Sequence, residues 1–152
     1  MNNQAFQDAY PDDLNHCYGC GRLNSEGLQL RSYWDGDETI ARFRPRPSQM
    51  VIPGYVYGGL LASLIDCHGV GSASAAAGRQ WPEQAPIRFV TASLHVDYLR
   101  PTPIDTELEI RGTIREVKEK KVIVSVTVWA NGQSCAKGQV VAVRMPASML
   151  KK

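Results

Sequence analysis

The feature that most constrains the fold is the segment 58–77, which carries one acidic residue, Asp66, and no lysine or arginine. As a helix, these residues would span about 30 Å. A helix that is apolar on nearly every side must be buried. Gly78 suits the end of such a helix, and Arg79 suits its negative pole. The sequence therefore predicts one central, buried helix.

Segments on both sides of this helix have the alternating pattern of β-strands. Two of them precede it, at 28–34 and 39–44, with a turn at 35–37. Four longer segments, rich in β-branched residues, follow at 87–99, 106–117, 122–130 and 134–145. This order predicts an α+β domain in which a long antiparallel sheet wraps around the central helix.

The length of 152 residues suits a single domain, which we expect to span 1–152. Residues 1–26 form its amino-terminal arm and a Cys-x₂-Cys loop, and 1–16 read as extended or loosely helical. Three prolines predict an irregular loop before the helix, at positions 45, 47 and 53.

Charge and hydropathy exclude several classes of partner. The net charge of +2 gives no reason to expect a nucleic-acid partner. No apolar run reaches the ~18 residues of a membrane span, and the start of the chain lacks the basic and apolar regions of a secretory signal. We therefore expect a cytoplasmic protein without a membrane partner.

Two glycines, Gly58 and Gly59, open the predicted helix, and Asp66 follows about two turns later. Glycines leave the N–H groups of a helix start unobstructed, and such donors can polarise a carbonyl group and hold a developing oxyanion. Burying a carboxylate is costly unless it is paired or used. Asp66 is therefore either a structural residue, bonded to backbone or to an arginine, or a residue that takes part in a reaction.

These residues belong to a wider pattern of three motifs, namely Tyr57-Gly58-Gly59 with Asp66, Cys17-Tyr18-Gly19-Cys20-Gly21 with Asn24 and Gly27-Leu28, and Tyr98-Leu99-Arg100-Pro101. In their order and spacing the chain resembles the hotdog-fold acyl-CoA thioesterases over nearly its whole length. The similarity is strongest to the branch related to the phenylacetate-pathway enzymes. That family typically has His-Gly-Gly at the helix start and an acidic residue nine positions after the histidine.

The resemblance implies a hotdog fold and the hydrolysis of an acyl-CoA to a free acid and CoA without a cofactor. It implies that the Gly58 N–H polarises the thioester carbonyl beside Gly59, and that Asp66 acts as general base or nucleophile. Tyr57 stands where the family has histidine. Tyrosine keeps one hydrogen bond of that histidine but does not shuttle protons near neutral pH.

Three further residues are candidates for substrate binding. Gln49, in the loop before the helix, is the nearest side chain to orient a water molecule, and Arg100 is a candidate contact for the phosphates of CoA. His68 lies two residues after Asp66, so the two side chains point about 200° apart on a helix. We expect a packed or interface histidine, with a contribution to a neighbouring subunit as the alternative.

The cysteines admit a metal site, because Cys17 and Cys20 have a metal-ligand spacing beside His16. A zinc site needs further ligands, and the chain has no second Cys-x₂-Cys or His-x₃-His. Cys67 and Cys135 lie in apolar runs and read as buried free thiols. The sequence thus favours a packed turn without metal over a zinc site, and a zinc site over a redox motif.

Two other functions fit the same pattern, namely a hotdog dehydratase and a protein that binds acyl thioesters without catalysis. The missing histidine at position 57 is what suggests the second. For any of these functions, long exposed edge strands favour pairing between sheets. We expect a homodimer, or a homotetramer built as a dimer of dimers, with sites between subunits.

Overall fold

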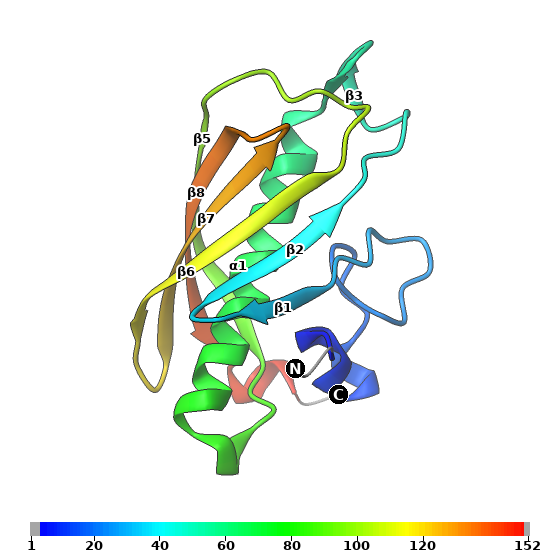
Figure 1. The fold of residues 1–152 in the computed structure, drawn as a ribbon. Coiled ribbons are helices and arrows are strands. Elements are labelled where there is room, and N and C mark those ends of the chain that lie inside the picture. The colour runs from blue at the N-terminus through cyan, green and yellow to red at the C-terminus, as the bar shows by residue number, and fades with distance from the viewer. Residues whose placement is uncertain (1–3, 151–152) are drawn as a thin grey trace.

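The structure is a computed structural model that describes residues 4–150 (Figure 1). Its longest element is the helix α1, Gly58–Gln80, which packs against a six-stranded antiparallel sheet. The strands lie in the order β1-β2-β6-β7-β8-β5, with bounds Ser32–Asp35, Glu38–Phe43, Leu108–Val117, Lys121–Ala130, Gln133–Arg144 and Phe89–Tyr98. The predicted hotdog arrangement, one long antiparallel sheet around one central helix, is confirmed.

The predicted burial of α1 is also confirmed. Leu64, Ile65 and Ala73 have no exposed surface, and the inward-facing valines of β7 are equally buried (Val122, Val124, Val126 and Val128). The helix is long and apolar enough to cross a membrane, but most of its apolar stretch is buried inside the domain. It is therefore the core helix of a globular fold.

The helix is longer than predicted, because Gly78 does not end it. It continues to Gln80, and the N–H of Trp81 donates to the Ala77 carbonyl at 2.8 Å. The Arg79 guanidinium lies 3.4 Å from the centre of the Trp34 ring, a cation–π contact between the last turn and β1. Tertiary contact of this kind outweighs the weak helix propensity of glycine.

Two other segments differ from the prediction. The proline-containing loop holds a short hairpin, β3 (Met50–Ile52) and β4 (Tyr55–Val56), which turns at Gly54 with a φ of 93°. Residues 28–31 are not part of the sheet. There the Leu30 N–H donates to the Gly19 carbonyl at 3.0 Å, so this stretch pairs with the cysteine loop.

The described part of the amino-terminal arm is ordered by side-chain hydrogen bonds and contains two short 3₁₀ helices, η1 (Phe6–Ala9) and η2 (Asp12–Leu14). The buried Asn15 donates to the Gln7 carbonyl at 2.9 Å and accepts the N–H of Arg22 at 2.9 Å. The Gln7 side chain accepts the Ser32 N–H at 3.0 Å. The arm is thereby fixed to the start of β1.

The strand β5 forms one edge of the sheet and is ten residues long. Its residues 91–95 are all exposed. Successive side chains of a strand point to opposite faces, so a strand packed on a helix should bury every second one. Both faces of β5 are therefore open along this stretch.

We predict that two glycines of α1 respond in opposite ways to alanine. A Cβ at Gly69 would lie 2.5 Å from a methyl carbon of Val140 on β8, so Gly69→Ala should destabilise the fold by about 1–3 kcal/mol. A Cβ at Gly78 would meet Ala85 at an ordinary 3.6 Å, so Gly78→Ala should be neutral or stabilising by up to about 1 kcal/mol. Urea unfolding of both variants measures this, and equal effects would contradict the close approach of α1 and β8.

Candidate active site

The start of α1 presents free backbone donors. Tyr57 is the N-cap, and its carbonyl accepts the N–H of Leu60 at 3.1 Å and of Leu61 at 3.4 Å. Within residues 4–150, the N–H groups of Gly58 and Gly59 have no protein acceptor. The first N–H groups of a helix are unsatisfied inside the helix and carry its positive pole. This end can therefore receive a carbonyl oxygen or an oxyanion.

Gly58 and Gly59 differ in the space that surrounds them. A Cβ at Gly59 would overlap the ring of Tyr57, so glycine at this position lets the ring lie against the first helical turn. A Cβ at Gly58 would lie 3.4 Å from the ring of Tyr98, which is tolerable contact. The Tyr98 hydroxyl, from the end of β5, donates to the Gly58 carbonyl at 2.8 Å. The predicted site residues Tyr57, Gly58 and Gly59 therefore lie at the helix start beside Tyr98, which is not one of the predicted site residues.

A cavity of about 310 Å³ adjoins this helix start. Its lining comes from the amino end of α1, from Val56 and from the segment after β5, and includes Gly58, Tyr98, Leu99 and Arg100. The exposed Arg100 donates from Nη1 to the Ser134 carbonyl at 2.6 Å. Arg100 and Gly58, two of the predicted site residues, therefore share one cavity.

Asp66 lies on the same side of α1, farther along β5. It is half-buried, and the Thr91 hydroxyl of β5 donates to its Oδ1 at 2.5 Å. Burial raises the pKa of Asp66, while the Thr91 hydrogen bond acts in the opposite direction. Among the described residues, no arginine or backbone group binds this carboxylate, so the structural pairing expected as the alternative is not what holds it.

The sequence does not predict Thr91. The strand that contains it is recognisable from its alternation, but the residue that faces Asp66 depends on how β5 lies across α1. No local pattern carries that information, since it is set by the packing of the whole sheet on the helix.

His68, the third candidate for substrate binding, is a packed residue of the core. It has no exposed surface, and its Nδ1 and Nε2 each lie 2.9 Å from a hydroxyl, those of Ser32 and Thr39. Burial lowers the pKa of His68 to about 4, so the ring is neutral. With both nitrogens occupied and no exposed surface, it reaches no substrate on either side of a subunit boundary.

Gln49 braces the loop in front of the site. Its side-chain oxygen accepts the Arg46 N–H at 2.8 Å, and its carbonyl accepts the Tyr57 N–H at 2.9 Å. Gln49 is therefore linked to the N-cap through the backbone, while its amide oxygen is already used within the turn. Its contact with substrate remains a prediction.

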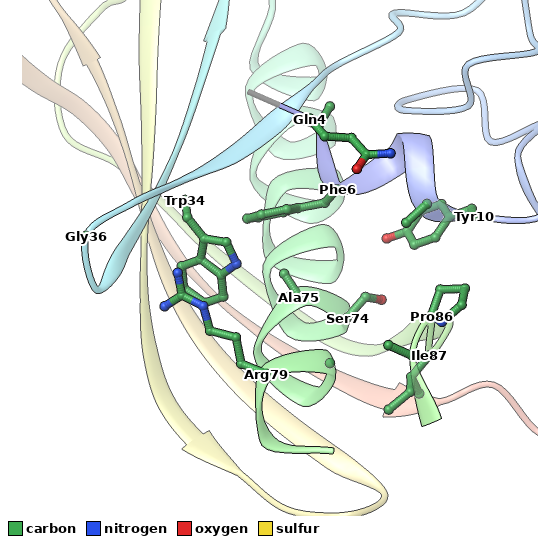
Figure 2. Close-up of a pocket in the computed structure, with 14 residues that line it drawn as sticks. Gln4, Phe6, Tyr10, Trp34, Gly36, Ser74, Ala75, Arg79, Pro86 and Ile87 are labelled. Atoms are coloured by element: carbon green, nitrogen blue, oxygen red, sulfur yellow. The ribbon is translucent and has the colours of Figure 1, made fainter. Parts of the chain in front are cut away.

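A second cavity, of about 440 Å³, lies at the opposite end of α1 (Figure 2). Trp34, Phe6 and Tyr10 line it together with Ser74 and Arg79 of the helix. None of its lining residues is acidic. It is larger than the cavity at Gly58, but its lining includes neither the free N–H groups at the start of α1 nor Asp66, so it is not the candidate reaction site.

Comparisons with known proteins agree with this fold. The family model of the thioesterase superfamily matches residues 53–137. The chain is similar to a thioesterase superfamily protein from Shewanella loihica PV-4, with 51% identity, a TM-score of 0.72, and coverage of 92% of this chain and 99% of that one. A search of curated proteins found no match.

More distant structures show the same fold. The E. coli PaaI protein from the phenylacetic acid degradation operon has 16% identity and a TM-score of 0.62, over 78% of this chain and 81% of that one. A putative thioesterase from Ralstonia eutropha JMP134, related to phenylacetic acid degradation, has 15% identity and a TM-score of 0.66, over 76% and 85%. The family match covers more than half of the chain and includes Gly58, Asp66 and Thr91. The chain therefore belongs to the thioesterase superfamily.

Proposed function

We propose that this protein hydrolyses an acyl-CoA thioester to the free acid and CoA, and that Asp66 drives the reaction. The observation that carries the proposal is the half-buried carboxylate of Asp66, the only acidic residue of α1, held by Thr91 beside an open strand. A carboxylate in an apolar helix with no cationic partner is costly to keep there for stability alone.

The reaction needs a group that activates the nucleophile and a donor for the carbonyl oxygen. As general base, Asp66 takes a proton from water, which adds to the thioester carbon. The C–S bond then breaks, and the proton passes to the CoA sulfur. As nucleophile, Asp66 itself displaces the CoA thiolate and forms an anhydride that water cleaves. In both routes the N–H of Gly58 stabilises the oxyanion.

Asp66 and Gly58 of one chain cannot serve the same carbonyl group. They are eight residues apart on one helix, which corresponds to about 12 Å along the axis. The carbon and oxygen of a carbonyl are only about 1.2 Å apart. The site is therefore complete only when Asp66 of one protomer lies opposite Gly58 of the partner subunit.

A two-fold dimer supplies this arrangement. The open edge of β5 carries Thr91 near Asp66 and Tyr98 near Gly58, so one exposed strand runs past both halves of the site. Pairing of β5 with its copy would satisfy the edge and create two equivalent sites. Arg100, at the rim of the cavity beside Gly58, would bind the anionic phosphates of CoA.

The four free cysteines suit a reducing compartment such as the cytoplasm.

One prediction of this mechanism concerns Asp66. Asp66→Asn keeps the shape of the side chain and removes its basicity and nucleophilicity, so turnover should fall by at least about 10²–10⁴-fold. Release of CoA thiol from a panel of acyl-CoA substrates measures this. Asp37→Asn, in the exposed β1–β2 turn, is the control and should leave turnover unchanged. Full activity of Asp66→Asn on the best substrate would refute the mechanism.

The next prediction isolates the backbone donor. Gly58 is the first helical residue and follows an extended Tyr57 (φ −62°, ψ 131°), a setting that accepts proline. Gly58→Pro removes the N–H and should lower kcat by about 10²–10³-fold, as loss of one oxyanion donor does. Gly58→Ala adds a Cβ but keeps the N–H, so it should retain most activity. Equal losses in the two variants would mean that the effect is steric.

Mixing the two inactive variants tests whether the site spans two subunits. A heterodimer of Asp66→Asn and Gly58→Pro chains has one site with both groups intact and one with neither. Random re-assembly of equal amounts should therefore restore about a quarter of wild-type activity. If both groups acted within one chain, no site would be intact and the mixture would stay inactive. A monomer by light scattering would likewise exclude the shared site.

A further inference from the structure

Three of the four cysteines meet at one point inside the domain. Cys17 and Cys20 lie in the loop that follows η2, and Cys67 lies on α1 next to Asp66. Their sulfur atoms are all within 4.8 Å of one another, and the Cys17 and Cys67 sulfurs are 3.8 Å apart. Cys20 and Cys67 are buried, Cys17 is partly exposed, and all three are free thiols. We call this group the three-cysteine cluster.

The expectation of a metal-free turn rests on the lack of a second Cys-x₂-Cys or His-x₃-His to complement His16, Cys17 and Cys20. Cys67 supplies a third ligand from a position 47 residues after Cys20. Spacing rules that search for a second local pair do not find such a residue. His16 is exposed and is not part of the cluster.

The loop is shaped to bring its sulfurs to the helix. A Cβ at Gly19 would collide with the Cys67 sulfur, so only glycine permits this approach. The N–H of Gly21 donates to the Cys17 carbonyl at 2.7 Å and closes the turn. The Gly19 carbonyl is fixed in turn by the N–H of Leu30 at 3.0 Å. The sulfurs are therefore held in place by the backbone, without a disulfide.

The spacing suits a metal ion with thiolate ligands. With Zn–S bonds of about 2.3 Å, two sulfurs on a tetrahedral zinc are about 3.8 Å apart, which is the separation of Cys17 and Cys67. The Cys20 sulfur lies within 4.8 Å of both, so all three sulfurs can reach one ion.

Packing alone gives a poorer account of the cluster. Buried cysteines that act only as small apolar residues have no reason to gather, and Cys135 shows the contrast. It is buried in β8, where its sulfur lies near the carbonyls of Gln133 and Pro101, away from the other three. Three sulfurs from two distant segments, one of them accessible to solvent, indicate a ligand.

We propose that Cys17, Cys20 and Cys67 bind one Zn²⁺ ion, with a water molecule or another small ligand in the fourth position. Soft thiolates select Zn²⁺ or Cu⁺ among the common metal ions. Three thiolates leave one net negative charge with Zn²⁺ but two with Cu⁺. The smaller residual charge favours zinc. The ion would join the amino-terminal arm to the helix residue beside Asp66.

The test is a metal titration of the full-length, reduced and demetallated protein. Co²⁺ should bind at one ion per chain and show sulfur-to-cobalt charge-transfer absorption, and Zn²⁺ should displace it. Each of the variants Cys17→Ser, Cys20→Ser and Cys67→Ser should lower the affinity for Zn²⁺. The loss should exceed about 10–100-fold, the usual effect of removing a residue that only hydrogen-bonds to a metal ligand. Cys135→Ser is the matched control and should bind like the wild type. None of these measurements depends on the proposed hydrolysis.

Circular dichroism of each variant shows whether it is folded. Should a serine variant fail to fold, the wild-type chain still provides a test, because Zn²⁺ at saturating concentration must raise its Tm by mass action. The proposal is overturned if the wild-type protein binds no Co²⁺ and its Tm does not rise when Zn²⁺ is added. Unchanged binding in the three folded cluster variants would also overturn it, as would binding of Cu⁺ without Zn²⁺. The proposal would also be overturned if protein purified under reducing conditions contained a disulfide between two of these three cysteines.

Discussion

The burial of α1 is the constraint on which the rest of the structure depends. A helix that is apolar on all sides has no face for solvent, so the sheet must curve around it, and each fully buried Leu or Ile contributes about 1.5–3 kcal/mol. Contact is close enough that Gly69 of the helix lies directly against Val140 of β8. Polar side chains on such a helix are exceptions, and each requires a specific partner. Asp66, Cys67 and His68 are three such exceptions in a row.

Most of the fold could be predicted because it follows from local sequence patterns. The apolar segment, the alternating strands and the turns between them each specify their own structure, and their order leaves few topologies. The hairpin of β3 and β4 could not be predicted, since its strands are too short to show alternation. The final turn of α1 escaped prediction for another reason, because the Arg79–Trp34 contact is tertiary.

For the candidate site, sequence indicates the residue types but not their partners. Gly58 and Gly59 are recognisable as a pair of glycines that opens an apolar helix, and Asp66 as the only acidic residue in that helix. Thr91 and the role of Cys67 depend on which strand or loop packs against which side of α1. His68 shows the same difference. Its direction away from Asp66 can be predicted from helix geometry. Its hydrogen bonds to Ser32 and Thr39 cannot, because they depend on tertiary packing.

The rotation of α1 about its axis links these features. His68 bonds to hydroxyls of β1 and β2, one of which also lies 2.7 Å from the Ser72 hydroxyl one turn along the helix. These buried bonds fix one rotational setting, because any other would leave several polar groups unsatisfied. Successive helix residues are about 100° apart, so the same setting directs Cys67 to the cysteine loop and Asp66 to β5. A buried histidine that touches no substrate thus positions the carboxylate proposed to act on one.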